Sequence, residues 1–363
     1  MTCLLHRWGL ALALLPTLAW SQVQITAVSA GEISTARAEP VRYTVRTAQP
    51  GRLALEILSG DGDVVRRIEA PGSVATGDHV LAWDGKDLRG QPVPDEAWCP
   101  RAVLFDATGR RLEDDPCTRT GGEVITGLQP QVTPGGDIAY TLEQPGRVLI
   151  RVGYKNGAMM RSLSVWRPRP AGRNLQRWNG FDDSGIVDLR NDRLSLLVTA
   201  FRLPDFSVVS AGNPQVDYRA WRTALGFAEK PDTPQGGAAQ PLERNGQRIA
   251  RQHYMARYKD AEPRIRVTFA QRDGTPLAAG APLPADVKVE VDLHPDDRWL
   301  MQEQLYEVAF FVNGDFVSEE ENGYVPIGWL WNTSNLKPGR HLFTVNLTGF
   351  TGRVGTKTIA VQK

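Results

Sequence analysis

The chain has 363 residues, and its 42 Lys and Arg residues nearly equal its 41 Asp and Glu residues, which gives a formal net charge of +1 at pH 7. Binding to nucleic acid or to an anionic membrane needs clustered positive charge, so this balance argues against both kinds of partner. The length favours two or three domains.

Residues 1–21 have the pattern of a signal peptide. Arg7 precedes the apolar run WGLALALLPTL, and the small residues Ala19 and Ser21 suit a cleavage site before Gln22. The run is too short to span a bilayer, and no later segment reaches about 18 uncharged apolar residues. We therefore expect an exported protein, periplasmic or at the cell surface or outside the cell, without an integral membrane span.

Two cysteines, Cys99 and Cys117, remain after removal of the signal peptide. An even pair in an oxidising compartment favours a disulfide, which in the chain-entropy model stabilises the fold by roughly 3 kcal/mol. The alternatives are two free thiols or a metal pair. No histidine lies beside either cysteine, and the disulfide is the preferred interpretation.

A repeat with a spacing of 95 residues occupies the front of the chain. Apolar and polar residues alternate in both copies, and Pro-Gly, Asp-Gly and Asn-Gly turns separate the alternating segments. Matching positions are Arg52 and Arg147 in the two PGR segments, Val64 and Met159, and Trp83 and Trp178. Short alternating strands with turns at this regular spacing predict two immunoglobulin-like β-sandwiches. The first comprises residues 22–122 and contains the disulfide, and the second comprises residues 123–212.

The segment AWDGKDLRGQPVPDEAW, which begins at Ala82, resembles the Ig-like domain of the flagellar hook-capping protein. The resemblance covers approximately residues 39–108 and, with more departures, residues 136–205. Nothing in the chain matches the hook-binding segment of that protein. The resemblance therefore implies a fold and a building-block role rather than flagellar assembly.

Each copy of the repeat contains a tryptophan, an Asx-Gly pair and an aspartate. The residues are Trp83, Asp84, Gly85 and Asp87 in the first copy and Trp178, Asn179, Gly180 and Asp182 in the second. A functional interpretation makes the acids calcium ligands or the tryptophan a sugar platform. Calcium needs six to eight oxygens, and replacing Asp84 by Asn179 keeps turn chemistry while removing a charge. We therefore favour a structural turn under a buried indole ring.

Residues 213–262 break the strand pattern. Asn213 is a candidate N-cap, Pro214 suits a first helical position and Gly226 suits a helix stop, so residues 213–227 predict a short helix that docks on a sandwich. Residues 229–241 are rich in Pro and Gly and predict a linker. The segment as a whole is expected to be a helical connector.

Residues 263–363 predict a third β-unit. Val287, Val289 and Val291 alternate strictly, and Asn313-Gly314 suits a type I′ hairpin turn. The run from this hairpin to the C-terminus looks like bacterial Ig-like domains of cell-surface and glycan-processing proteins, which implies a spacer or a binding module. The expected fold class is all-β, with three Ig-like or fibronectin-like sandwiches in tandem and a short helical connector.

Motifs of catalysis are missing from the sequence. There is no G-x-S-x-G, H-E-x-x-H or P-loop spacing, and the four histidines of the mature chain are scattered. We expect no catalytic residues, no metal site and no cofactor.

Two functional hypotheses remain. The first is a non-catalytic exported component of a bacterial envelope or surface assembly, which binds another envelope or surface protein. The second is a glycan-binding accessory module, in which Trp299 and Tyr324 contact a polysaccharide. Trp329 and Trp331 share one face of an expected strand, and core packing is the better interpretation of that pair.

Overall fold

The computed structural model describes residues 22–37, 39–229, 242–301, 306–349 and 351–363. The expected signal peptide lies outside these residues, as does most of the expected linker. No helix within the described ranges is long and apolar enough to cross a membrane.

The first unit is a sandwich of two mainly antiparallel sheets. Its strands are β1 (Val23–Val28), β2 (Glu32–Ser34), β3 (Val41–Thr47), β4 (Gly51–Leu58), β5 (Val64–Val74), β6 (Gly77–Trp83), β7 (Ala97–Phe105) and β8 (Arg111–Asp114), and a helical turn, α1 (Pro116–Arg119), follows them. One sheet has the order β1-β3-β6, and β4 lies between β5 and β7 in the other. The alternation of Val41, Tyr43 and Val45 buries these residues on one side of β3, as the period of two predicts.

The second unit repeats this arrangement. Its strands are β9 (Val124–Ile125), β10 (Gln131–Val132), β11 (Ile138–Leu142), β12 (Gly146–Tyr154), β13 (Met159–Arg169), β14 (Gly172–Gln176) and β15 (Leu194–Arg202). The sheets have the orders β10-β11-β14 and β13-β12-β15-β9. The central strands β11, β12, β13, β14 and β15 thus occupy the places that β3, β4, β5, β6 and β7 have in the first sandwich.

The third unit has two sheets of the same kind. Its elements are β19 (Ile265–Ala270), β20 (Asp286–Leu293), the 3-10 helix η3 (Pro295–Met301), β21 (Tyr306–Val312), β22 (Asp315–Gly323), β23 (Ile327–Asn332), β24 (Arg340–Gly349) and β25 (Val354–Gln362). Trp331 is 2% exposed and Trp329 packs against the same core, as expected for that pair. The predicted all-β fold class, built from Ig-like or fibronectin-like sandwiches, is confirmed.

The strand β16 (Val208–Ala211) departs from the expected division at residue 212. It pairs with β7 and β2 of the first unit and with no strand of the second among the described residues. The place beside β7 that β16 fills corresponds to the place beside β15 that β9 fills in the second unit. The second unit is therefore inserted into the first, which the chain completes only after residue 208.

The connector packs onto the first unit as part of its core. Its elements are α2 (Tyr218–Ala224), β17 (Leu242–Arg244), β18 (Gln247–Ile249), and the 3-10 helices η1 (Arg251–Tyr254) and η2 (Arg257–Lys259). Tyr218, Trp221 and Tyr258 belong to the hydrophobic core of the first sandwich, and the Trp221 ring meets the Trp98 ring edge-on at 5.4 Å.

The helix begins later than the sequence predicts. The N-cap of α2 is Asp217, whose carboxylate accepts from Ala220 N at 2.8 Å. The amide of Asn213 instead donates to backbone oxygens of Pro92 and Val93. Asn213 is thus used to hold the connector against the first unit. Gly226, with φ of 78°, follows the helix end as expected.

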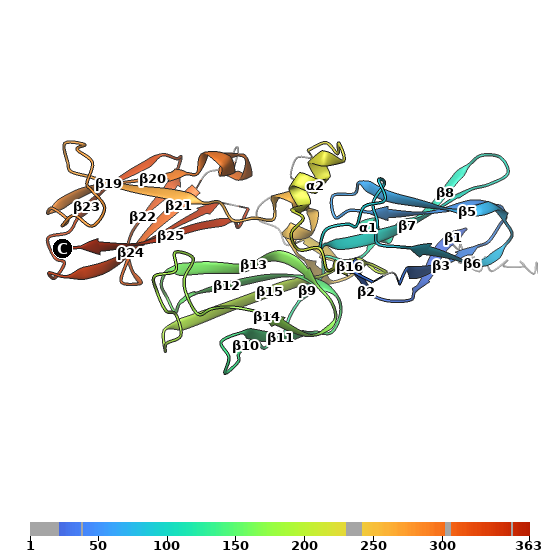
Figure 1. Ribbon diagram of the computed structural model, residues 1–363, viewed down its shortest axis with the longest axis horizontal. Coiled ribbons are helices and arrows are strands. Elements are labelled where there is room, and N and C mark those ends of the chain that lie inside the picture. The colour runs from blue at the N-terminus through green and yellow to red at the C-terminus, as the bar shows by residue number, and fades with distance from the viewer. Residues whose placement is uncertain (1–21, 38, 230–241, 302–305, 350) are drawn as a thin grey trace, which may run out of the picture.

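The three units meet at one place. In Figure 1 the first and third units form the two ends of the molecule, the second unit lies beside the middle, and α2 lies across from it. Phe311 of β21 packs in the core cluster of the second unit, and Met159 N donates to Asn346 Oδ1 at 2.8 Å, so the second and third units are also in direct contact.

Trp221→Ala tests the role of the connector. Removing a buried indole from the core should destabilise the first unit by about 3–5 kcal/mol. This loss of stability should make the backbone amides of β7 exchange their hydrogens faster with solvent. Val216→Ala, at a residue that is 36% exposed, is the control and should leave the exchange rates unchanged. Unchanged protection in Trp221→Ala would mean that the connector is a linker without a structural role.

Candidate functional site

The tryptophan motif of the first unit forms a turn closed by side-chain hydrogen bonds. Trp83 is fully buried, and its Nε1 donates to Lys86 O at 3.0 Å. Asp84 Oδ1 accepts from Lys86 N, and Gly85 has a φ of 75°, where glycine is favoured. Asp87, also fully buried, accepts from Arg89 N and Gln91 N at 2.9 and 3.0 Å.

The second unit builds the same turn with different residues. Trp178 Nε1 donates to Phe181 O at 3.0 Å, and Gly180 has a φ of 84°. Asn179 Oδ1 accepts from Phe181 N, which is the bond that Asp84 makes in the first copy. Asp182 is 1% exposed and accepts from the backbone N–H groups of Ser184, Ile186 and Val187.

These bonds leave the acids of the motif engaged with the backbone rather than directed at a ligand. Asp87 has one further partner, because its Oδ2 accepts from Trp221 Nε1 at 3.1 Å and so joins the turn to the connector. Within the described part of the chain, no group of three or more His, Cys, Asp or Glu residues is placed to hold a metal ion. The geometry is that of a structural turn in both copies.

Alanine substitutions in the turn should separate the structural from the calcium interpretation. Asp87→Ala and Asp182→Ala leave several buried N–H donors without an acceptor, so each should destabilise its unit by about 2–3 kcal/mol. Asp84→Ala changes a side chain that is 43% exposed and should destabilise the first unit by less than about 1 kcal/mol. Thermal unfolding with and without millimolar calcium measures both effects. A calcium-dependent melting temperature that Asp87→Ala abolishes would contradict the structural interpretation.

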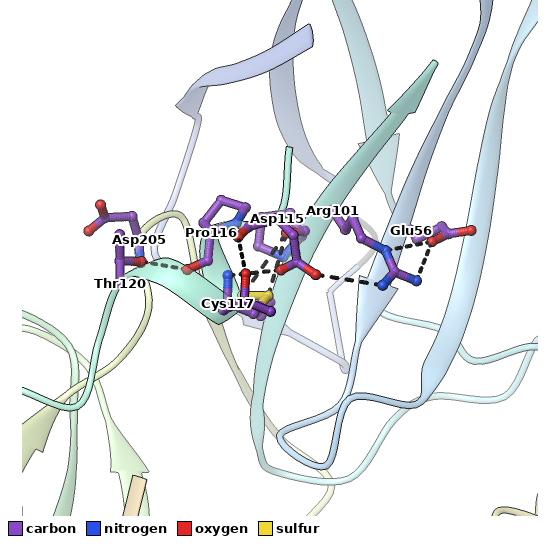
Figure 2. Close-up of a disulfide and its surroundings, with 10 residues drawn as sticks. Glu56, Arg101, Asp115, Pro116, Cys117, Thr120 and Asp205 are labelled. Atoms are coloured by element: carbon purple, nitrogen blue, oxygen red, sulfur yellow. Dashed lines mark hydrogen bonds and ion pairs between the residues drawn. A yellow bond between two sulfur atoms is a disulfide. The ribbon is translucent and has the colours of Figure 1, made fainter. Parts of the chain in front are cut away.

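The predicted disulfide between Cys99 and Cys117 is present and ties β7 to α1, with a Cα–Cα distance of 6.1 Å. Figure 2 shows its surroundings: Asp115 caps α1 by accepting from Cys117 N, and Arg101 links Asp115 to Glu56. Burial raises the pKa of Asp115. At the far end of α1, Thr120 Oγ1 accepts from Asp205 N, which follows the last strand of the second unit. Because the disulfide holds α1 on β7, this bond also ties the end of the second unit to the first.

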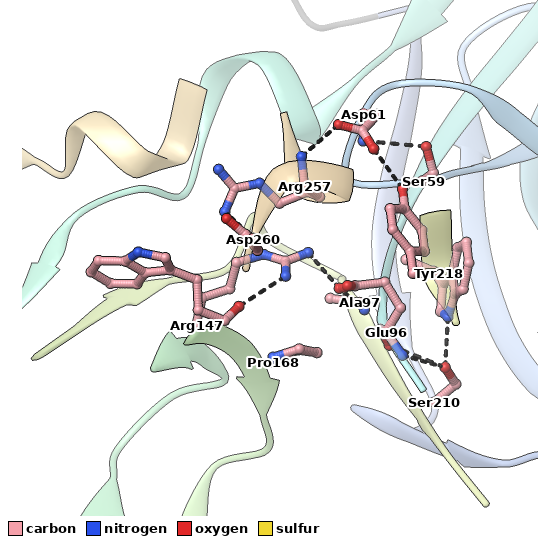
Figure 3. A network of polar contacts seen from close by, with 12 residues as sticks. Ser59, Asp61, Glu96, Ala97, Arg147, Pro168, Ser210, Tyr218, Arg257 and Asp260 are labelled. Atoms are coloured by element: carbon pink, nitrogen blue, oxygen red, sulfur yellow. Dashed lines mark hydrogen bonds and ion pairs between the residues drawn. The ribbon is translucent and has the colours of Figure 1, made fainter. Parts of the chain in front are cut away.

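Charged side chains are buried where the first unit, the second unit and the connector meet. Arg147 of β12 donates to Glu96, which precedes β7, at 2.5 Å, and both side chains are at most 5% exposed. Asp61 accepts from Tyr218 Oη at 2.8 Å and from Arg257 N at 2.7 Å, as Figure 3 shows. We call Asp61, Glu96, Arg147, Arg257 and Asp260 the junction cluster.

The Arg257–Asp260 pair is a part of the junction cluster in which burial changes the proton affinity of both partners. The two side chains lie 3.0 Å apart. Burial raises the pKa of Asp260 to about 7, although the guanidinium groups of Arg257 and Arg147 favour its ionised form. Burial also lowers the pKa of Arg257. Both shifts have one cause, because the pair is withdrawn from water.

The raised pKa of Asp260 gives a pH dependence of defined sign. The folded protein holds the Asp260 proton more tightly than the unfolded chain, so the free energy of unfolding falls as pH rises from about 4 to about 7. Asp260→Asn has no such proton and should lose this part of the dependence. Its melting temperature relative to the wild type should rise across that window, whereas groups without a direct interaction with Asp260, such as His253, contribute to both curves in the same way. Parallel melting curves would contradict the shift.

Cavities large enough for a small molecule lie at two places beside the junction cluster. The larger, about 490 Å³, lies beside the disulfide and is lined by Arg101, Arg147, Phe201, His253 and Arg257 among others. Its three guanidinium groups are already paired with carboxylates, and burial lowers the pKa of His253 to about 4. The imidazole is therefore neutral near pH 7. The smaller, about 340 Å³, lies among the connector and all three units.

The expected glycan contacts, Trp299 and Tyr324, lie in different surroundings. Tyr324 is 70% exposed and is not part of either cavity wall. Trp299 of η3 is half-buried, packs parallel to the Tyr258 ring and lies 3.6 Å below the guanidinium carbon of Arg219. It lines the smaller cavity. Trp299 thus belongs to the contact between the third unit and the connector.

Sequence reasoning did not identify the junction cluster. Arg147 stands in a PGR segment whose first copy ends with Arg52, and Arg52 is exposed. The repeat does not predict that one of these arginines is buried, because the difference in burial between Arg52 and Arg147 arises from the units that pack around them. Trp166, half-buried on the wall of the smaller cavity, was also missed.

Comparisons with known proteins place the chain in no named family. No family model matches it, and no curated protein matches it. Among solved structures, FlgD from Xanthomonas campestris, a hook-capping protein, aligns with 33% of this chain and 79% of its own at 17% identity and a TM-score of 0.21. The fibronectin(III)-like modules of Clostridium thermocellum CbhA align with 94% of this chain and 93% of theirs at 9% identity and a TM-score of 0.20.

An endo-beta-1,4-mannanase from Thermotoga petrophila also matches, at 16% identity and a TM-score of 0.20. That alignment covers 28% of this chain and only 20% of the mannanase. TM-scores this low carry no conclusion about activity or partners. The fold assignment follows from the strand pairing of the chain itself.

Proposed function

We propose that this chain is a non-catalytic, exported component of a bacterial envelope or surface assembly and that it works through contacts with another protein. The observation that carries the proposal is the junction cluster, which holds the first unit, the second unit and the connector together. The third unit is held against the second by the contacts of Phe311 and Asn346. An exported chain of this kind presents strand edges and loops from several units as one rigid surface.

The energetics of the junction support a scaffold role. Burying Glu96 and Arg147 withdraws two charges from water, so the pair contributes little net stability, but separating the partners leaves an uncompensated charge. Arg151 of the second unit and Glu262 of the connector form a second such contact at 2.5 Å. Paired charges of this kind favour one alignment of the units over a range of alignments, whereas independent modules need only a flexible linker.

The same contacts support a role without catalysis. In the larger cavity the guanidinium groups of Arg101, Arg147 and Arg257 are held by carboxylates. A nucleophile activated by a neighbouring base is the arrangement that covalent catalysis needs, and the sequence offers no motif of that type.

A pull-down from envelope extracts of the producing bacterium tests the proposal. The wild-type chain should recover one stoichiometric partner protein. Arg147→Ala, which strands Glu96 and uncouples the units, should lose most of that recovery, while Arg42→Ala, at an exposed arginine of the first unit, should keep it. Recovery of the wild-type chain alone would contradict a role in an assembly.

A further inference from the structure

Trp166 has a backbone conformation that its side chain disfavours. It lies in a bulge of β13, where the register with β12 shifts between the Val148–Arg167 and Ile150–Ser164 pairs. Its φ is +50°, in the left-handed region. The first unit has a bulge in the matching part of β5, and there the residue with positive φ is Gly72, which follows Pro71, the residue that the 95-residue spacing matches with Trp166. Glycine adopts this conformation without strain, and tryptophan does not.

The bulge itself does not explain why a tryptophan, rather than a glycine, stands at position 166. Its backbone carbonyl accepts from Arg147 Nη1 at 3.1 Å, and a glycine would offer the same oxygen. The indole ring packs on Phe201, with a centroid distance of 5.3 Å, and also forms part of the wall of the 340 Å³ cavity. Backbone strain maintained for a side chain in a cavity wall is characteristic of functional positions, and bulges often redirect such a side chain.

The cavity wall combines aromatic rings with paired charges. The rings come from four elements: Trp166 of β13, Tyr218 of α2, Tyr258 of η2 and Trp299 of η3. Acids and arginines lie between them, among them Asp217, Asp260, Asp296, Asp297, Arg167 and Arg264. Arg264 pairs with Asp297 at 2.7 Å. Tyr218 and Tyr258 are largely buried, and Arg219 covers one face of Trp299, so the Trp166 ring is the main flat apolar surface of the wall. It stands beside carboxylates and guanidinium groups that can bond to hydroxyls.

We propose that this cavity binds a short segment of a neutral saccharide, with the C–H face of a sugar ring on the Trp166 ring and the hydroxyls bonded to the surrounding carboxylates and guanidinium groups. The volume lies within the range of small-molecule sites. Tryptophan suits this task because its large rigid ring contacts an apolar face at little entropic expense. The site is separate from the protein-partner surface proposed above and does not depend on it.

Two other ligand classes fit the wall less well. An anion needs an excess of positive charge, whereas the wall holds five acidic side chains and four arginines. Two of these arginines, Arg257 and Arg264, have carboxylate partners within 3.0 Å. A peptide strand needs a regular sheet edge, and β13, the edge strand of its sheet, enters the cavity at the bulge where its ladder is interrupted.

Isothermal titration calorimetry on the full exported chain tests the proposal, with cellohexaose, mannohexaose and chitohexaose as neutral probes and hexagalacturonate as the anionic probe. At least one neutral probe should bind. Trp166→Gly keeps the favoured backbone and removes the ring, and its affinity should fall at least tenfold. Trp166→Tyr should restore most of the binding, and Trp166→Leu should not, because only a flat ring can stack on sugar.

Tyr324→Ala is the matched control, since it removes an exposed aromatic ring outside the cavity, and it should bind as the wild type does. The proposal is overturned if no neutral probe binds the wild type, if hexagalacturonate binds more tightly than all three, or if Trp166→Leu binds as well as Trp166→Tyr. The last result would assign the ring to packing alone.

Discussion

The ion pair between Glu96 and Arg147, 2.5 Å apart and almost completely withdrawn from water, is the constraint on which the arrangement of the units depends. Each charge comes from a different sandwich, so neither can be buried unless the two sandwiches are docked. Glu96 is also held on the first unit, since its N–H donates to Ser210 of β16 and its carboxylate accepts from Ala97 N. A small change in the docking angle would leave one of the charges without its partner in a medium of low polarity.

The topology makes this burial possible. Because β16 returns to the first unit after the second is complete, two chain crossings join the sandwiches, whereas a simple tandem array has one. Ser210 of this returning strand accepts from Trp98 Nε1 at 2.8 Å, and Trp98 in turn packs on Trp221 of the connector. The contacts of Ser210, Trp98 and Trp221 thus belong both to the core of the first unit and to its contact with the connector. A substitution that weakens the core therefore also weakens the docking of the connector.

Much of the fold could be predicted from the sequence, because alternation, turn residues and the repeat are local properties. Asp84 and Asn179 make the same bond, as their shared turn chemistry implies. The site could not be predicted in this way. Arg52 and Arg147 occupy equivalent places in the repeat, yet one is exposed and the other is buried by a neighbouring unit. The return of β16 and the docking of α2 likewise depend on partners far away in the sequence, which periodicity does not report.

The duplicated bulge shows how one scaffold acquired two local uses. In β5 the bulge carries Gly72, with no atom within 4 Å of where a Cβ would stand, so it is an open turn at the surface. In β13 the corresponding bulge faces the connector, and Trp166 holds Arg147 through its carbonyl while its ring lines the cavity. One residue therefore links the alignment of the units to the shape of the cavity. A shift of the Trp166 backbone would therefore act on the same guanidinium group that pairs with Glu96.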